Sequence, residues 1–321
     1  MIESALYEHL QNQERLLSDY LASYGGKMAI FNQEAPADTD EGWQDPADED
    51  EEQDEPTEMY SERVKTSQYG RLVFAVDLSD DPERKYSGTL SVDVLCEKGV
   101  QLPEEIEPIV RALIDGYFFS TEEITMAAQW SASNYFTEPT NKIIGVTLTF
   151  GLLAFPKQTT IDPDPIALLN EWSSKELKNI LMENLRVIGH DPLKAAWKPT
   201  NDSPAVYWRL TNINPCSWIP DTYHCSWHTA VISGHILAPD KGVCASIARK
   251  IDNILTLKRR LIFDDKSPLM VDRNIRINLS HDPMKVGQIT LDATYGILRQ
   301  YEQYDPINNV SVAERRSNDG I

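Results

Sequence analysis

The residues best suited to chemistry in this chain are two cysteines and three histidines in its second half. They are Cys216, His224, Cys225, His228 and His235. A zinc site needs four converging sulfur or nitrogen ligands, so the residue types are suitable. The spacing is not, because Cys225 falls on a predicted strand and points to the face opposite His224 and His228. The sequence favours packed thiols and imidazoles, and we expect no metal ligands.

The other two cysteines, Cys96 and Cys244, lie in apolar surroundings and are predicted to be small buried side chains. No CxxC pair occurs, so we expect no disulfides. The N-terminus lacks the basic and apolar regions of a signal peptide. The longest apolar run, 143–155, is too short and too interrupted for a membrane helix. These features predict a soluble protein in a reducing compartment.

Most of the net charge of −20 comes from one acidic segment, residues 34–62. It holds 14 Asp and Glu and no Lys or Arg, which leaves −6 for the rest of the chain. So polar a segment buries too little apolar surface to offset the entropy of ordering, which predicts a disordered or weakly ordered insertion within the first domain. Three interpretations stay open: a solvated loop, a weak site for divalent cations, or a surface that repels DNA phosphates.

Enzyme signatures are missing from the sequence. It has no Walker loop, GxGxxG, GxSxG or HExxH motif. Most carboxylate pairs lie in the acidic segment, where no apolar pocket would raise a pKa for general acid catalysis. We therefore expect no catalytic and no cofactor-binding residues. Without clustered Lys and Arg, free nucleic-acid binding is also disfavoured.

The elements that must position these residues follow one order in each half: helix, strand, strand, helix, strand, strand. Apolar spacing predicts helices over 2–24, 102–114, 166–188 and 243–261. Alternating or β-prone runs predict strands over 27–31, 71–78, 87–95, 129–136, 142–155, 205–213, 223–237, 274–280 and 287–300.

Three short matches link the two halves in the same order along the chain. Each match is weak alone, and together they predict an internal repeat. Glu97-Lys98-Gly99-Val100 matches Asp240-Lys241-Gly242-Val243, Ile109-Val110-Arg111 matches Ile247-Ala248-Arg249, and Thr149-Phe150-Gly151-Leu152-Leu153 matches Thr294-Tyr295-Gly296-Ile297-Leu298.

The predicted fold class is α+β, with two tandem copies of an α-β-β-α-β-β unit. Each copy would be an antiparallel or mixed sheet packed by helices. The expected boundaries are a first domain over 1–156, a proline-containing linker over 157–163 and a second domain over 164–304, followed by a polar tail over 305–321. A length of 321 residues suits two domains of this size.

These patterns resemble the tail terminator (tail completion) proteins of tailed bacteriophages. The residues that carry the resemblance are the predicted hairpin strand from Pro204 to Leu210, the Glu97-Lys98-Gly99 turn before a helix, and the closing strand Phe150-Gly151-Leu152-Leu153. Members of that family form a hexameric ring on the last ring of the tail tube. They stop tail polymerisation, dock to the head connector and are not enzymes. A typical member has one domain, about half this length.

The resemblance implies a structural virion protein, assembled in the host cytoplasm and placed in the tail or neck. Its partners would be itself in a ring, the tail tube protein, the head-tail connector protein and genomic DNA that passes through the lumen without specific binding. No membrane is implied. Three chains would give a pseudo-sixfold ring, and six chains a ring with an extra outer or stacked layer.

Other functions remain as alternatives. The nearest is another neck or tail component, either a head-tail joining protein or a tail tube protein, although a tube protein would need a long hairpin and no clear one is predicted. An enzyme or binding protein with an acidic metal site is a second alternative. A host protein that binds basic partners through residues 34–62 is a third.

Overall fold

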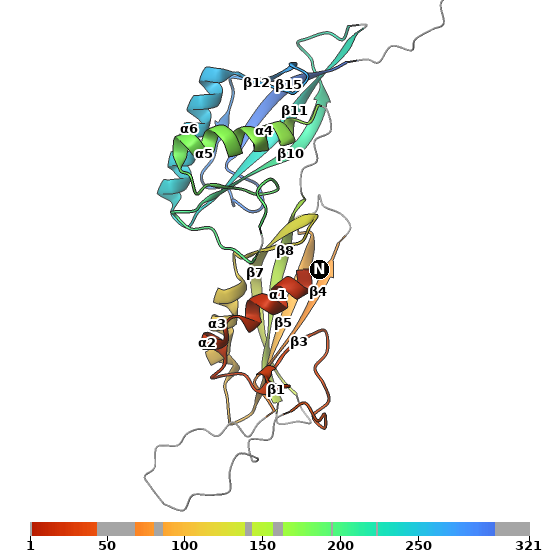
Figure 1. The fold of residues 1–321 in the computed structure, drawn as a ribbon, viewed down its shortest axis with the longest axis vertical. Coiled ribbons are helices and arrows are strands. Elements are labelled where there is room, and N and C mark those ends of the chain that lie inside the picture. The colour runs from red at the N-terminus through yellow and green to blue at the C-terminus, as the bar shows by residue number, and fades with distance from the viewer. Residues whose placement is uncertain are drawn as a thin grey trace, which may run out of the picture.

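The computed structural model describes residues 2–43, 68–79, 86–138, 143–156, 163–193, 195–222 and 224–298. These residues form two α+β units that follow one another along the longest axis of the molecule (Figure 1). The first unit ends with the strand that closes at Pro156, and the second opens with a helix at Pro165. Most of the predicted linker, residues 157–162, and the predicted tail lie outside the described residues.

The first unit is a six-stranded sheet with helices before it and within it. Its strand order is β3-β4-β5-β8-β7-β6, and only the β3–β4 pair is parallel. The elements are α1 (Ile2–Gln11), α2 (Glu14–Leu17), β3 (Ile30–Asn32), β4 (Arg71–Leu78), β5 (Gly88–Glu97), α3 (Pro103–Ile114), β6 (Phe118–Ser120), β7 (Ile124–Thr137) and β8 (Ile143–Pro156), with a separate ribbon of β1 (Ser23–Tyr24) and β2 (Lys27–Met28).

The second unit is a seven-stranded sheet. Six strands follow the order β9-β10-β11-β15-β13-β12, and β14 pairs β15 off this path; only the β9–β10 pair is parallel. The elements are α4 (Pro165–Trp172), the π-helical turn η2 (Ser173–Leu177), α5 (Lys178–Leu181), β9 (Arg186–Val187), β10 (Ala205–Pro215), β11 (Cys225–Leu237), α6 (Lys241–Lys258), β12 (Arg260–Ile262), β13 (Pro268–Val271), β14 (Arg276–Ile277) and β15 (Ile289–Leu298).

Read from the parallel pair onward, the two strand orders correspond. The parallel pair β3–β4 takes the place of β9–β10, and β5, β8, β7 and β6 take the places of β11, β15, β13 and β12. Each unit also has helices before its first sheet strand and one helix between its third and fourth. The α+β class is thus confirmed. The strand predicted over 274–280 is shorter than expected, since β14 covers only Arg276–Ile277, and β13 is a strand that the sequence did not predict.

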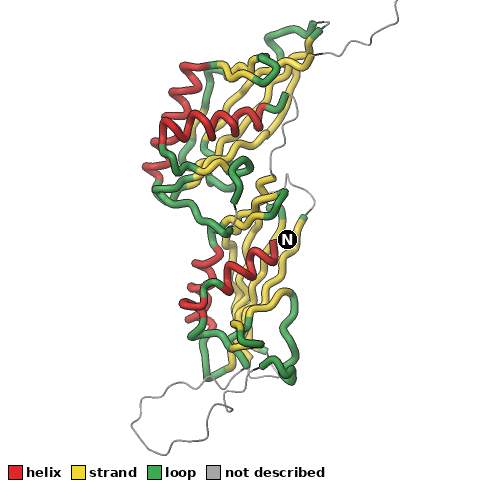
Figure 2. Tube along the Cα trace, viewed as in Figure 1, coloured by secondary structure: helices red, strands yellow, loops and turns green. Residues whose placement is uncertain are grey.

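Among the described residues, the helices of each unit pack on one face of its sheet (Figure 2). In the first unit, Leu6 of α1 and Val110 of α3 join Phe74 and Phe150 of the sheet in one buried cluster. In the second, Trp172 and Ile251 join Trp208 of the sheet in another. Residues of alternate parity along β8, such as Thr147 and Thr149, face the side that none of the described helices covers. Each unit therefore has its own core.

A smaller apolar cluster joins the end of the first unit to the start of the second. Phe155 of β8 packs edge-on against Tyr207 of β10, with ring centroids 4.6 Å apart. Phe118 and Trp197 exchange backbone hydrogen bonds of 2.7 and 3.0 Å across the two units. The Lys198 ammonium also donates to the Asp115 carbonyl at 2.8 Å. The units are thus held end to end by specific contacts.

Three predicted helices are wrong in extent. The first stops at Leu17, because Leu21 and Ala22 are buried beyond it, where Ala22 donates to the Gly70 carbonyl. The helix predicted over 166–188 ends at Leu181 and includes a π-helical turn. The last helix ends at Lys258, because Arg259 adopts a left-handed conformation and β12 follows. In each case apolar spacing runs on past the residues that are helical.

The hairpins are longer than the sequence predicts. β7 and β8 have 14 residues each and pair over nearly their whole length, with one irregularity between Trp130 and Ala132. β10 and β11 form a second long pair. The expectation that no long hairpin exists is therefore wrong. The sequence pattern predicts this strand only from residue 129, whereas β7 begins at Ile124, so the first five residues of the strand are missed.

Two of the three sequence matches lie on corresponding elements of the two units, and the third does not. Thr149 and Thr294 lie on the closing strands β8 and β15, and Ile109 and Ile247 lie on α3 and α6. The Gly pair does not correspond, because Gly99 has a φ of +87° in the turn after β5, whereas Gly242 lies in the first turn of α6. The similar residues of that match therefore occupy different backbone positions near the starts of α3 and α6.

Candidate interaction surfaces

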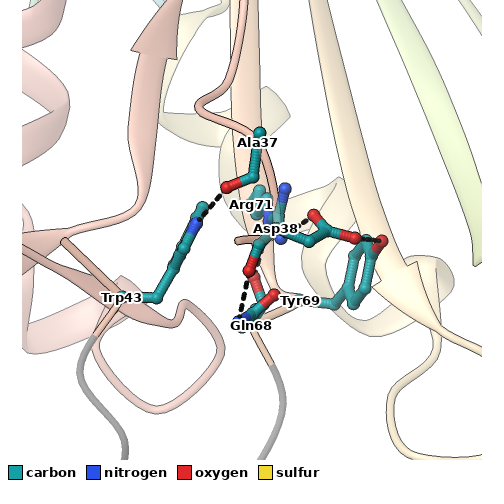
Figure 3. Close-up of polar contacts among 6 residues, drawn as sticks. All are labelled: Ala37, Asp38, Trp43, Gln68, Tyr69 and Arg71. Atoms are coloured by element: carbon teal, nitrogen blue, oxygen red, sulfur yellow. Dashed lines mark hydrogen bonds and ion pairs between the residues drawn. The ribbon is translucent and has the colours of Figure 1, made fainter. Parts of the chain in front are cut away.

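The most elaborate polar cluster among the described residues surrounds Arg71, the first residue of β4 (Figure 3). Its guanidinium carbon lies 4.1 Å from the Trp43 ring centroid and 4.4 Å from that of Tyr69. It donates to an Asp38 carboxylate oxygen at 2.7 Å and to the Gln68 carbonyl at 2.6 Å. We call these five residues the arginine clasp. A cation held between two aromatic faces and a carboxylate is a strong local anchor.

The arginine clasp joins the two ends of the segment 44–67. Trp43 precedes that segment and Gln68 follows it, and the Gln68 amide donates to the Asp38 carbonyl at 2.8 Å. The Trp43 indole donates to the Ala37 carbonyl at 3.0 Å. Of the segment 34–62, which was predicted to be disordered or weakly ordered, residues 34–43 form a loop held by these hydrogen bonds. The rest of that prediction, 44–62, lies outside the described residues.

Electrostatics within the clasp follow from its hydrogen bonds. The Arg71 guanidinium lowers the pKa of Asp38, and the Tyr69 hydroxyl, which donates to the same carboxylate at 2.9 Å, lowers it further. Partial burial and the Asp38 charge raise the pKa of Tyr69. Because the pKa of Asp38 is lower in the folded chain, its ionised carboxylate stabilises the folded state at pH values above the ordinary pKa of Asp. This stabilisation is lost as the pH falls through the lowered pKa. At neutral pH the clasp is fully ion-paired.

One edge of the first sheet carries exposed aromatic side chains. β6 pairs with β7 only at Thr125, Met126 and Ala127, so most of β7 has no neighbouring strand on that side among the described residues. Along this part lie Trp130 and Tyr135, which are 37% and 54% exposed. Long, apolar free edges are sites where another chain can pair.

The second sheet has a similar free edge on its other side. β9 pairs with β10 only at Ala205 and Val206, and Leu210 and Ile213 are exposed farther along β10. Trp218 follows the strand and is 63% exposed. Sequence alternation could not reveal these edges, because it predicts a strand and not how far its neighbour extends.

Among the described residues, the members of the metal-like set do not gather around one point. Within the described residues, no three His, Cys, Asp or Glu side chains gather closely enough to hold a metal ion. Cys225 and His228 lie at positions of opposite parity on β11, as predicted. His228 contacts the Tyr295 ring, and His235 is buried against the Pro283 carbonyl and the Ser233 hydroxyl. All four cysteines are thiols, and burial raises the pKa of Cys96 to about 12.

The arginine clasp is the feature that sequence reasoning missed. Trp43 was visible as a large apolar residue in an acidic run, but nothing in its spacing linked it to Arg71, 28 positions later. The useful signal is local: an aromatic residue stands at each end of the segment 44–67, Trp43 before it and Tyr69 two positions after it, with an arginine close by. Aromatic residues on both sides of a long polar loop, with an arginine nearby in the sequence, can be recognised without a structure.

No protein-family model matches the chain. No curated protein matches it either. None of the helices in the described part of the chain combines the length and apolar character that a membrane crossing requires.

Proposed function

We propose that this chain is a structural, non-enzymatic virion protein that forms a ring at the head-proximal end of a bacteriophage tail tube. In that place it ends tail polymerisation and docks to the head connector. Its partners are further copies of itself, the tail tube protein and the head-tail connector protein, and genomic DNA passes through the lumen without specific binding. It assembles in the host cytoplasm and ends in the tail or neck of the virion.

The observation that carries the proposal is the shared strand order of the two units. The same order, with the parallel pair at corresponding places, is what a tandem duplication of one unit would leave. A duplicated unit supplies like surfaces within one chain, and like surfaces repeated around an axis build closed rings. The free edges of β7 and β10 add surfaces through which neighbouring copies could pair.

The arrangement of the units favours six chains over three. A pseudo-sixfold ring of three chains needs the two units of one chain to lie side by side around the axis. In Figure 1 the units instead follow one another along the longest axis. Six chains, each contributing one unit to a ring and the other to a second layer, fit this arrangement better.

The charge distribution suits a passage for DNA. Residues 1–156 hold 31 Asp and Glu against 10 Lys and Arg, while residues 157–321 hold 19 against 20. The net charge is therefore −21 over residues 1–156 and +1 over residues 157–321, so all of the excess negative charge belongs to the first unit. Carboxylates repel phosphates at short range, so a lumen near this unit would let DNA slide without adhering.

The direct test is genetic, in a phage that encodes this chain. Removing its gene should give tails of uncontrolled length and heads without tails, and supplying the chain from a plasmid should restore infectious particles. If tails of normal length joined to heads still form without the gene, the proposal is contradicted.

A second candidate, a tail tube protein, is favoured by the long hairpins. β7 with β8, and β10 with β11, supply the extended strands that stacking in a tube requires. The same gene removal separates the two functions, because loss of a tube protein leaves no tails whereas loss of a terminator leaves overlong ones.

A further inference from the structure

We propose that a groove on the second sheet binds an extended acidic peptide, and that this peptide is the acidic segment 44–62 of a second copy of the chain. The contact goes beyond the proposed ring and does not rest on it, because a groove can hold a peptide whether or not the copies close into a ring. Its basis is a set of guanidinium groups that line the second sheet at a place where the first sheet is built differently.

The groove lies across the middle of β11 and β15, on the face of the sheet opposite the core, and has a volume of about 710 Å³. Thr229 and Thr294 line it, and their hydroxyl groups hydrogen-bond at 3.1 Å. The next residues along the same strands, Ala230 and Ala293, point into the core instead. Trp218, in the loop after β10, also lines the groove and is 63% exposed. The groove therefore combines a β-sheet floor with an exposed aromatic ring.

Three arginines give the groove its charge, and we call it the arginine groove. They are Arg259, Arg260 and Arg273, and all three are exposed. None of them forms an ion pair with an Asp or Glu of the described part of the chain. Guanidinium groups bind carboxylates and phosphates through paired hydrogen bonds. The groove is thus suited to an anionic ligand.

A carboxylate in the groove narrows the choice of ligand. Asp292 of β15 lines the groove, and no donor among the described residues hydrogen-bonds its side chain. The nearest guanidinium nitrogen, of Arg276, is 3.9 Å from its Oδ1 atom. A carboxylate without a donor favours a ligand that brings an N–H group. An extended acidic peptide offers backbone N–H groups together with carboxylates, whereas a phosphodiester backbone offers acceptors alone, so a peptide fits better than a nucleic-acid strand.

The first sheet is built differently at the matching place. The sequence match that includes Thr149 and Thr294 places Thr147 of β8 where β15 has Asp292. There, the Thr147 hydroxyl donates to the Asp93 carboxylate at 2.6 Å, so this carboxylate has its own donor. β12 starts with an arginine, whereas β6, which takes the same place in the first sheet, starts with a phenylalanine. The arginine groove is therefore a feature of the second unit and does not follow from the shared strand order.

The acidic segment 44–62 has the chemistry that complements the groove. It holds ten Asp and Glu and no Lys or Arg. It also contains Met59 and Tyr60, apolar side chains that suit Trp218 and Met270 in the groove lining. Arginine pairs with carboxylates and stacks on aromatic rings. Opposite charges on the two partners also speed their encounter and fix their register.

The peptide comes from another copy, because the distance within one chain is too great. Both ends of the segment 44–67 lie beside Arg71, which pairs with Leu95 at the end of the first sheet away from the second unit. Tethered at both ends, its 24 residues extend at most about 40 Å from there. The units follow one another along the longest axis (Figure 1), so the way to the groove runs along β8 to Pro156 and then along β10 to Asn214. At about 3.3 Å per residue these two strands span about 65 Å.

The first test measures, by fluorescence anisotropy, how a labelled peptide of residues 44–62 binds to the full chain. Arg260→Glu with Arg273→Glu should weaken binding at least about tenfold, because like charges then face each other. Arg249→Glu with Lys250→Glu makes the same change of charge at exposed positions of α6, which packs on the core face, and should bind as wild type does. Arg260→Gln with Arg273→Gln should lie between the two. Circular dichroism should show the same fold in all variants.

The second test asks whether the peptide is supplied by a second copy. A full chain that lacks residues 45–62 keeps the groove, and the Arg260→Glu, Arg273→Glu variant keeps the segment. In sedimentation velocity at low salt, each alone should associate more weakly than wild type. An equimolar mixture should associate as wild type does, because one variant supplies the groove and the other the segment.

Four results would overturn the inference. They are equal binding of the peptide by the groove variant and the α6 control, equal binding of a peptide with Asn and Gln in place of every Asp and Glu, a mixture that associates no better than its components, and displacement of the peptide by a thymidine 20-mer at lower concentration than by unlabelled peptide. None of these results bears on the tails that form without the gene, so the proposed function and this contact can fail separately.

Discussion

At the scale of single residues, Arg71 is the side chain whose loss should be felt most at the base of the acidic segment. Replacing it with Met removes two ring contacts and two hydrogen bonds of the guanidinium, to Asp38 and to Gln68, while keeping most of the side chain's volume. We expect the free energy of unfolding to fall by about 2 kcal/mol. Chemical denaturation measures this. Arg15→Met, at an exposed position of α2, is the control and should change stability by less than about 0.5 kcal/mol; equal effects of the two variants would contradict the role of the clasp.

His235 should make the free energy of unfolding depend on pH. Burial lowers its pKa from 6.5 to about 4, so the folded chain keeps this imidazole neutral. Between those values the unfolded chain binds a proton that the folded chain does not, so stability falls as the pH drops from 6.5 towards 4. The loss at pH 4 should be about 3 kcal/mol. Denaturation midpoints of wild type and His235→Gln across this range should differ in slope, and identical slopes would refute the assignment.

At the scale of elements, the π-helical turn η2 depends on one buried hydrogen bond. The Trp208 indole of β10 donates to the Ser173 hydroxyl at 2.7 Å, and both residues are buried. Ser173→Ala leaves that indole N–H without a partner and should cost about 1 to 3 kcal/mol. Ser174→Ala, one position along and partly exposed, is the matched control. Thermal unfolding would contradict this account if both variants melted together.

The same element shows what sequence could and could not predict. Leu169, Trp172 and Leu177 follow helical spacing, so the helix was predicted. The π-helical turn was not, because it arises where Ser173 meets a tryptophan from a distant strand. Strands with strong alternation, such as β4, have their predicted bounds. The short edge strands β6 and β12 have three residues each, too few to show a period, and their sheet partners determine them.

At the scale of the whole molecule, the two cores should unfold as separate units joined by a small contact. Phe155 packs against Tyr207 and Phe118 between the units and belongs to neither core. Phe155→Ala should therefore widen the interval between two calorimetric transitions while leaving the far-ultraviolet circular dichroism unchanged. Truncating a buried Phe costs about 3 to 5 kcal/mol, enough to resolve such a shift. A single transition in both proteins would show that the units are one cooperative body.

Electron microscopy of the purified full chain tests the central claim, a ring built from like units, most directly. Images taken at increasing protein concentration should show closed rings with a central hole. The particle mass measured in the same sample should correspond to six chains in each ring. Three chains in each ring would be the pseudo-sixfold alternative. Single chains up to the highest soluble concentration, or open fibres without a closed ring, would contradict the claim.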